Sequence, residues 1–391
     1  MKILILTSHI GGSATGIVTK NIIEGLLLNE VNLHVLNEQN NSNLRENDNL
    51  KIHTINYKKL KSSGFYSELS LVLFSYPLNE IRFINKATKK AKQLQQHNKF
   101  DVIMVLSSAA GYHLLQTGLN IKNKLSLPLY IHSTDPIPAP KPWYNTQSLR
   151  SSIIFFARRI YKKVDFISLS NKHMLAYQKK IMGIKKTPSF VVHNPSSNTR
   201  VLQYVKRHKN KVFLYVGSIY HQRQPDTLIE SFDMFSKNKE VELWFLGNSK
   251  NLNLDKYNLS PDTKSKIKCI EFQKDPSSTI AKADVLVDFD ANFQNDVFIS
   301  SKLITYLNTN IPILSLTPKH SPTDKLLDAK VNLGVVKMYY RDDNKEFSFQ
   351  NVLDLKSPLP EDVVLNRNKI LFDFDNINIT SQIVKHLQNE L

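Results

Sequence analysis

The segment FISSKLITYLNTNIPIL, residues 298–314, joins a helical pattern to a short apolar strand. Apolar side chains recur at helical spacing after residue 302, and Ser300 or Ser301 suits the N-cap of the helix. Asn310 suits a left-handed C-cap. The apolar run 313–316 then reads as a buried strand. The segment therefore predicts a helix that leads into a strand of a parallel sheet.

The same alternation runs through both halves of the chain. Strands separated by helices form parallel sheets that are covered by helices on both faces. Right-handed crossovers then make each half a doubly wound, Rossmann-like α/β domain. The expected strands are residues 2–6, 33–36, 102–106, 129–131, 166–169, 190–192, 212–216, 242–246, 267–271, 285–288 and 313–316, and the clearest helices are residues 15–28, 81–96, 149–163, 226–236, 277–283 and 301–308.

A polar, basic stretch separates the two halves. HNPSSNTRVLQYVKRHKN, residues 193–210, offers few core residues and indicates a linker. We expect an N-terminal domain at 1–195, a linker at 196–210 and a C-terminal domain at 211–375. The final helix, 376–391, could pack on either domain. Because ligands of such sheets bind beyond the carboxyl ends of the strands, two facing domains would line a central cleft, and the chemistry should lie in loops that follow strands.

The bulk composition excludes several classes of protein. The chain has 391 residues and is 41% hydrophobic, as is usual for globular proteins of two or three domains. Cys269 is the only cysteine, which excludes a disulfide framework or a thiolate metal cluster. The net charge of +18 permits an anionic partner, but the basic residues are spread along the chain. No apolar stretch reaches the length of a membrane span or of a signal peptide core.

Two loops of the first half carry candidate residues. HIGGSATG, residues 9–16, follows the opening strand, and Gly11 and Gly12 allow a tight turn and a close backbone approach to a ligand. In the second loop His132 and Asp135 follow a strand. His132 could accept a hydrogen bond, act as a base or line a sugar site, although a single histidine is more often structural.

Two loops of the second half carry cations. In YVGSIYHQRQPDTLIESF, residues 215–232, Gly217 ends a strand and Arg223 precedes a helix. A guanidinium there could hold a diphosphate, and a solvated surface arginine is the plainer alternative. Lys302, at the start of the helix described above, could hold the same diphosphate from another side.

Together these loops resemble the family-4 retaining glycosyltransferases of the GT-B fold, particularly those of bacterial polysaccharide assembly. The resemblance covers most of the chain. Gly217 and Arg223 match the glycine and the lysine of the family's phosphate loop, and SKLITYLNTNIPIL is similar to its "SK-x-x-EY … G-x-PI" segment. Gly11 and Gly12 match its N-terminal glycine loop, and the histidine near its acceptor sugar matches His132.

Four positions depart from the family pattern. Ser218 stands where the family has an arginine, and Thr305 replaces the glutamate that binds the donor ribose. Gln224 and Asn310 replace glycines. The hydroxyl of Thr305 can contact a ribose, but more weakly than an ionised carboxylate. Nearby serines and Asp296 are hypothetical substitutes.

The resemblance implies that a sugar passes from a nucleotide-sugar donor to a hydroxyl of a glycan or lipid-linked acceptor, with retained configuration and without a metal or another cofactor. The first domain would bind the acceptor and the second the donor. The implied catalytic residues are His132, Arg223 and Lys302, the donor-binding residues are Gly12, Gly217, Ser218, Arg223, Ser300, Ser301, Lys302 and Thr305, and the acceptor-side residues are Gly11, Gly12, His132 and Asp135.

Three alternatives stay open. The missing glutamate suits a catalytically silent GT-B relative that binds another glycosyltransferase or a glycan. A nucleotide-sugar epimerase of the same architecture is weaker, because it needs several carboxylates in the cleft and the sequence offers few candidates. A nucleic-acid binder is weakest, since no clustered basic and aromatic face is visible, and we expect no nucleic-acid partner.

Two segments suggest contact with a membrane. SIIFFARRIYKK, residues 152–163, places apolar side chains beside four basic ones, which suits an anionic membrane surface. FYSELSLVLFSYPL, residues 65–78, is a second candidate on the acceptor side. A core helix with a solvated edge explains each segment equally well. We expect a cytoplasmic protein with a peripheral contact at the inner face of the cell membrane.

Overall fold

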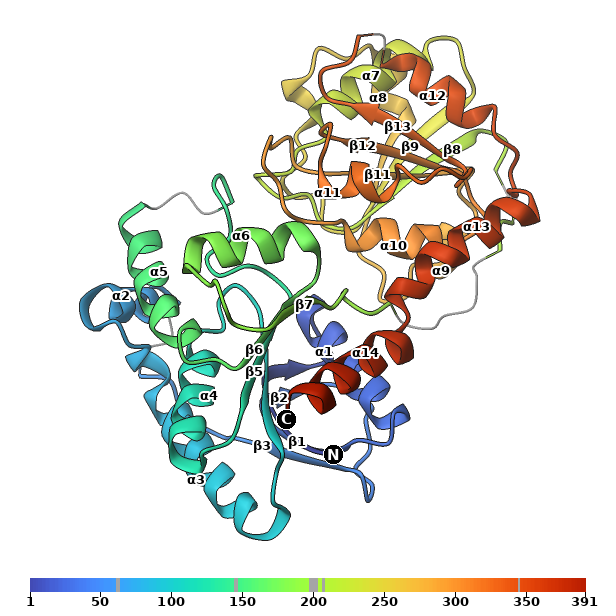
Figure 1. The fold of residues 1–391 in the computed structure, drawn as a ribbon. Helices are drawn as coiled ribbons and strands as arrows, with labels where there is room; N and C mark the ends of the chain where they lie inside the picture. The colour runs from blue at the N-terminus through green and yellow to red at the C-terminus, as the bar shows by residue number, and fades with distance from the viewer. Residues whose placement is uncertain (61–63, 144–146, 197–202, 206–207, 344) are drawn as a thin grey trace. The chain divides into compact units, whose positions relative to one another are not determined.

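The chain folds into two compact units. Unit 1 comprises Met1–Ser197 together with Asp373–Leu391, and unit 2 comprises Asn198–Phe372 (Figure 1). The structure is a computed structural model that describes residues 1–60, 64–143, 147–196, 203–205, 208–343 and 345–391. Within the expected linker 196–210, residues 197–202 and 206–207 lie outside this described part.

Unit 1 is built on a parallel sheet of seven strands in the order β3-β2-β1-β4-β5-β6-β7. The middle strands are buried on both faces, as their continuous apolar runs predict. The strands are β1 (Lys2–Ile10), β2 (Asn32–Asn40), β3 (Leu50–Thr54), β4 (Val102–Ser107), β5 (Leu129–Ser133), β6 (Phe166–Leu169) and β7 (Ser189–Val191).

Helices cover both faces of this sheet. Leu4 and Leu6 of β1 belong to the core under α3, α4 and α5, whereas Ile3 and Ile5 face the core under α1 and α14 (Figure 1). This alternation follows from the two-residue period of a strand. The helices of unit 1 are α1 (Ala14–Leu28), α2 (Gly64–Phe74), α3 (Ile81–Asn98), α4 (Tyr112–Leu125), α5 (Gln147–Tyr161), α6 (Lys172–Met182) and α14 (Asn376–Glu390).

The C-terminal helix α14 packs on unit 1. Asp375 caps it by accepting hydrogen bonds from the backbone N–H groups of residues 377 and 378. Its apolar residues Ile379, Ile383 and Leu387 enter the same core as α1. A Cβ at Gly25 of α1 would lie 2.5 Å from the carbonyl oxygen of Asn376, so the two helices approach closely. The chain thus returns to unit 1 after completing unit 2.

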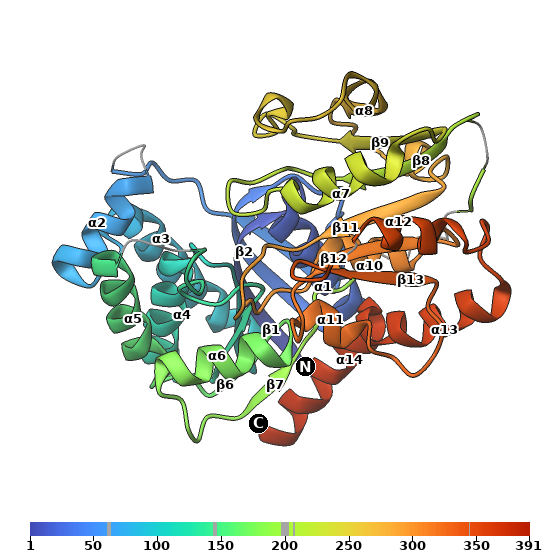
Figure 2. The same ribbon diagram turned by 90° about the horizontal axis from the view of Figure 1, so that it is seen from above.

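Unit 2 repeats the plan with a parallel sheet of six strands in the order β10-β9-β8-β11-β12-β13. Helices α7 and α12 pack on one core of this sheet, and α10 and α13 lie together on its other side (Figures 1 and 2). The elements are β8 (Lys211–Val216), α7 (Asp226–Ser236), β9 (Val241–Leu246), α8 (Pro261–Lys266), β10 (Ile267–Ile270), α9 (Ser277–Ile280), β11 (Val285–Phe289), α10 (Ser301–Leu307), β12 (Ile313–Thr317), α11 (Pro322–Leu326), β13 (Val335–Tyr339), α12 (Glu346–Leu353) and α13 (Glu361–Leu371).

The doubly wound α/β class is confirmed, but the sequence pattern missed one strand in each sheet. These strands, β3 and β13, both lie at a sheet edge and pair on one side only. Most of their residues are partly exposed, so neither carries the continuous apolar run of a central strand.

No helix in the described part of the chain is long and apolar enough to cross a membrane.

Candidate functional site

In unit 2, two strand ends bring Arg223 and Lys302 to one place. Lys302 is the second residue of α10, and its side chain lies across the end of β8. A Cβ at Gly217 would lie 2.4 Å from Cε of Lys302, so a glycine is needed where the lysine stem passes. The ammonium lies 5.3 Å from the ring centre of Tyr215, the penultimate residue of β8.

Arg223 approaches from the loop between β8 and α7. Its backbone N–H donates to the carbonyl of Tyr220 (3.0 Å), and only 8% of the residue is exposed. Burial alone lowers the pKa of Arg223, but the charges of Asp290 and Asp288 outweigh it and raise the pKa overall. Arg223 is therefore a buried, permanently charged group beside carboxylates.

Two buried carboxylates at the end of β11 face these cations. The Ser300 hydroxyl donates to Oδ1 of Asp288 (2.6 Å), and the Thr317 hydroxyl donates to Oδ2 of Asp290 (2.7 Å). Burial and the charge of Asp288 raise the pKa of Asp290, while Arg223 opposes the rise. A third buried acid, Asp296, also stabilises the charge on Arg223. The expectation of few carboxylates near the site is therefore wrong.

Lys302 is held less tightly than Arg223. Burial and the nearby guanidinium lower its pKa to about 8, against the opposing charges of Asp288 and Asp290. Its ammonium forms neither a hydrogen bond nor an ion pair with any residue that the structure describes. The Lys302 ammonium can therefore donate a hydrogen bond to an anion that binds beside Arg223.

The predicted residues of α10 divide into two groups. Ser300 is the N-cap residue, but its hydroxyl donates to Asp288 and makes no capping hydrogen bond. Ser301 and Thr305 are exposed, and the Thr305 hydroxyl donates to the Ser301 carbonyl (3.2 Å). The expected left-handed cap at Asn310 is wrong, because α10 ends earlier and Asn308 caps it with φ −83°.

The structure thus brings Gly217, Arg223, Ser300 and Lys302 together around the carboxylates. Ser218 lies beside them, half-buried, and its carbonyl accepts a hydrogen bond from the hydroxyl of Tyr215 (3.1 Å). Asp288 and Asp290 are not among the site residues expected from the sequence. The available signal was the run VDFDAN, which puts two acids at the carboxyl end of a buried strand.

In unit 1 the predicted glycines form a tight loop at the end of β1. Gly11 and Gly12 have φ of +72° and +73°, and the Gly11 N–H donates to the Gly16 carbonyl (2.8 Å). A Cβ at Gly11 would lie 2.9 Å from the carbonyl oxygen of Asn41. Backbone conformation and packing inside unit 1 therefore already require these glycines.

His132 is completely enclosed at the end of β5. Its Nδ1 lies 2.8 Å from the Ser168 hydroxyl, and its Nε2 is buried without a partner among the described residues. Burial lowers its pKa to about 4, so it is neutral at pH 7. Asp135 nearby is half-buried, and burial raises its pKa. A sugar can contact His132 only after a change that uncovers Nε2.

This enclosure predicts that His132 destabilises unit 1 in acid. The unfolded side chain binds a proton near pH 6.5, whereas the folded one does not until about pH 4. Stability therefore falls as the pH drops through this window, by up to about 3 kcal/mol. Urea unfolding of the Trp244→Phe protein, followed by Trp143 of unit 1, should show this loss. A His132→Gln change should remove that part of the loss, and equal acid sensitivity with and without it would contradict the assignment.

Comparison with known proteins bears on the fold. No protein-family model and no curated protein sequence matches the chain. Solved structures do match: the lipopolysaccharide outer core galactosyltransferase WaaB has a TM-score of 0.61 at 14% identity, with 100% of each chain covered. The fold is GT-B.

Other GT-B structures extend the likeness to different chemistries. A variant of S. aureus TarM, solved with Fondaparinux, alpha-GlcNAc-glycerol and UDP, gives a TM-score of 0.62 at 10% identity over 100% of this chain and 99% of that one. The UDP-GlcNAc 2-epimerase from Methanocaldococcus jannaschii gives 0.54 at 13% identity, with 100% of each chain covered. The GT-B fold therefore leaves the reaction to be argued from the site.

Proposed function

We propose that this chain is a glycosyltransferase that moves a sugar from a nucleotide-sugar donor to a hydroxyl of a glycan or lipid-linked acceptor. The reaction would be retaining and metal-independent, as in family 4, and would serve the synthesis of a capsule, an exopolysaccharide or another cell-surface glycan. The observation that carries the proposal is the pair of cations, Arg223 and Lys302, at the carboxyl end of the unit 2 sheet.

The chemistry of the leaving group explains why two cations matter. Departure of a nucleoside diphosphate gathers negative charge on its phosphate oxygens in the transition state. Arg223 can hold two of these oxygens with its planar fork, and Lys302 can place a point charge on another. Fixed protein cations would then supply the charge that Mg²⁺ supplies in other phosphoryl sites, so we propose that no metal or other cofactor is needed.

The carboxylates balance the charge of Arg223 within the protein. The charges of Asp288 and Asp290 offset the desolvation cost of burying Arg223. One oxygen of each acid accepts a hydrogen bond, Oδ1 of Asp288 from Ser300 and Oδ2 of Asp290 from Thr317, and both side chains are buried. We therefore assign them to positioning of the cations rather than to proton transfer. An epimerase would need such carboxylates on the sugar itself, and this arrangement does not favour it.

One observation keeps a second candidate in view. Thr305, at the position where the family has its ribose-binding glutamate, is exposed and donates to the backbone of its own helix. A GT-B relative without donor turnover, acting as the binding partner of another glycosyltransferase, would tolerate this. Turnover of any nucleotide-sugar would exclude that candidate.

A panel of nucleotide-sugars tests the proposal. The first step is thermal stabilisation, because a ligand bound only by the native protein raises its melting temperature. The hits then go into NMR assays with and without candidate glycan acceptors, in the presence of EDTA. We expect release of the nucleoside diphosphate and a product with the anomeric configuration of the donor. Conversion of the donor to another nucleotide-sugar would point to the epimerase instead.

The lowered pKa of Lys302 predicts how pH acts on nucleotide binding. A bound diphosphate favours the charged ammonium, so affinity should be greatest below about pH 8 and should fall as the pH rises above it. The fall approaches about tenfold per pH unit while the free protein loses this proton and the complex retains it. Titration calorimetry from pH 7 to 9.5 measures this slope. A Lys302→Met protein should show no such slope, and a flat profile in the unmodified protein would contradict the assignment.

A further inference from the structure

Unit 1 exposes a group of large apolar side chains on two neighbouring helices. Leu73 and Phe74 at the end of α2 are 63% and 62% exposed, and Phe155 in the middle of α5 is 65% exposed. Helices α2 and α5 lie side by side (Figures 1 and 2). Scattered apolar residues are normal on a surface, but three that cluster at one helix pair indicate an interaction site.

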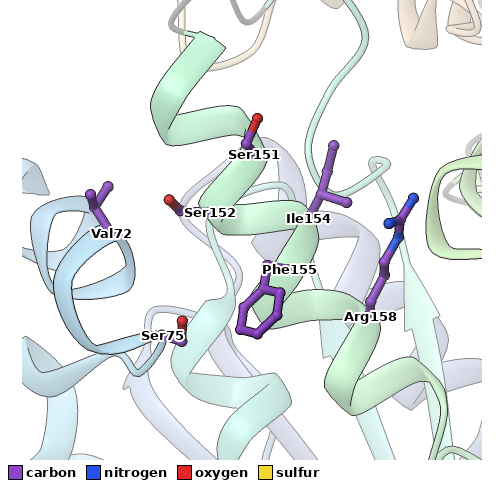
Figure 3. A pocket seen from close by; sticks show the side chains of 7 residues that line it. All are labelled: Val72, Ser75, Ser151, Ser152, Ile154, Phe155 and Arg158. Carbon is purple, nitrogen blue, oxygen red and sulfur yellow. The ribbon is translucent and has the colours of Figure 1, made fainter.

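A hollow lies between the same two helices. Its volume is about 640 Å³, and Val72 of α2 and Ser75, the residue after α2, line it together with side chains of α5 (Figure 3). From α5 come the hydroxyl side chains of Ser151 and Ser152, the apolar side chains of Ile154 and Phe155, and Arg158. The lining therefore mixes apolar side chains with serine hydroxyls and one arginine.

Basic residues continue from this hollow along the chain. Arg158 donates from Nε to the carbonyl of Ile181 (2.8 Å), and its terminal nitrogens make no hydrogen bond or ion pair within the described residues. Lys162 and Lys163 follow α5 and are exposed. The α5 sequence QSLRSSIIFFARRIY contains no acidic residue, and Glu68 is the only one in α2. Exposed apolar groups beside uncompensated positive charge complement an anionic lipid surface.

We propose that the α2–α5 face, made of Leu73, Phe74, Phe155, Arg158, Lys162 and Lys163, docks unit 1 on an anionic bilayer. The aromatic and leucine side chains enter the boundary between headgroups and acyl chains, and the basic side chains contact lipid phosphates. The biological role of this membrane contact rests on the proposed function with a lipid-linked acceptor. Binding of unit 1 to the bilayer requires no nucleotide. A protein surface as partner would not require negatively charged lipid.

Vesicle sedimentation with the full chain tests the contribution of the basic residues of the α2–α5 face. Binding is measured on vesicles of phosphatidylcholine alone and of phosphatidylcholine with phosphatidylglycerol. We expect binding only to the anionic vesicles, weakened by salt. Each neutralised cation near the surface should weaken binding about fivefold, so the triple change R158Q, K162Q and K163Q should weaken it about 100-fold. The same charge loss at exposed lysines of unit 2, K237Q, K330Q and K356Q, should have a much smaller effect.

A second set of variants tests the contribution of the apolar residues of the α2–α5 face. The double change Phe74→Ser and Phe155→Ser should weaken vesicle binding about tenfold or more. It removes the two exposed aromatic rings that we expect to enter the boundary between headgroups and acyl chains. Phe347→Ser with Leu365→Ser, at exposed sites of unit 2, should leave it unchanged. Equal losses in both pairs, or equal binding to neutral and anionic vesicles, would overturn the proposal. Nucleotide-sugar binding without vesicle binding would refute this surface alone, and the reverse result would refute the proposed function alone.

Discussion

Replacing Lys302 by methionine is expected to weaken the binding of a nucleoside diphosphate roughly 10- to 150-fold. Methionine keeps most of the stem that crosses Gly217 but removes the ammonium, which makes no ion pair or hydrogen bond within the described residues. The loss corresponds to one charge-assisted contact, about 1.5–3 kcal/mol. Titration calorimetry at pH 7 with the nucleoside diphosphate of the best donor measures it.

Arg223 should matter at least as much, and its variants separate charge from geometry. Arg223→Lys keeps a positive charge beside Asp288 and Asp290 but cannot make the bidentate contact. It should fold and bind the diphosphate more weakly than the unmodified chain. Arg223→Ala would in addition leave buried carboxylates without their cation and should lower the stability of unit 2.

A matched control guards against a general effect of charge. Lys356 is an exposed lysine of the same unit, and Lys356→Met removes one charge at a position outside the site. It should leave affinity within about twofold, since exposed charges are screened at physiological salt. If Lys302→Met and Lys356→Met bind the diphosphate equally well, the phosphate assignment is wrong.

The second large effect concerns stability. Arg367→Leu should destabilise unit 2 by about 3–5 kcal/mol. The fully buried Arg367 of α13 donates from Nε to the carbonyl of Leu333 (2.6 Å) and from its terminal nitrogens to the carbonyls of Thr309 (2.7 Å), Ile311 (3.0 Å) and Gly334 (3.1 Å). Leucine would remove the guanidinium donors from the carbonyls of Leu333, Thr309 and Ile311 and would open a cavity, whereas the Gly334 carbonyl keeps the backbone N–H of Ile313 (3.0 Å).

These contacts explain why the residue is an arginine although its charge is costly there. Burial lowers the pKa of Arg367 to about 9. Its fork ties the turn after α10 to the residues that lead into β13, so one side chain satisfies backbone groups of two separate segments. Because α10 carries Lys302, this connection also supports the candidate site.

The two tryptophans allow the stability effect to be assigned to one unit. Trp244 lies in β9 of unit 2 and Trp143 lies in unit 1, so a Trp143→Phe background reports unit 2 alone. Urea unfolding followed by Trp244 should shift its midpoint strongly in Arg367→Leu. Lys369→Leu, an exposed position on the same helix, should shift it little. A small shift in both would show that the buried guanidinium is dispensable.

The sequence predicts a residue's position best where that position depends on a single strand or helix. The proximity of Gly217, Arg223 and Lys302 could be predicted because each follows a recognisable strand or opens a helix, and parallel sheets gather such residues at one edge. The edge strands β3 and β13 were missed because their residues are only half-buried and carry no continuous apolar run. Strand periodicity reports burial, and edge strands have little of it.

Features that depend on tertiary contacts could not be predicted from the sequence. In the sequence Asp288 and Asp290 have the pattern of ordinary strand-end acids, and only the fold brings Arg223 close to them. The enclosure of His132 depends on its place beneath the surface of unit 1, which no local pattern specifies. Asn310 has the residue type of a helix cap, but its side chain bonds instead to Gln203 (2.6 Å) and to the backbone N–H of Tyr204 (2.7 Å).

The most direct test of the central claim is a crystal structure of the full chain with the nucleoside diphosphate that stabilises it most. We expect phosphate oxygens within about 2.7–3.2 Å of both the Arg223 guanidinium and the Lys302 ammonium, at the end of β8. A nucleotide bound elsewhere, with both cations still facing only Asp288 and Asp290, would contradict the account.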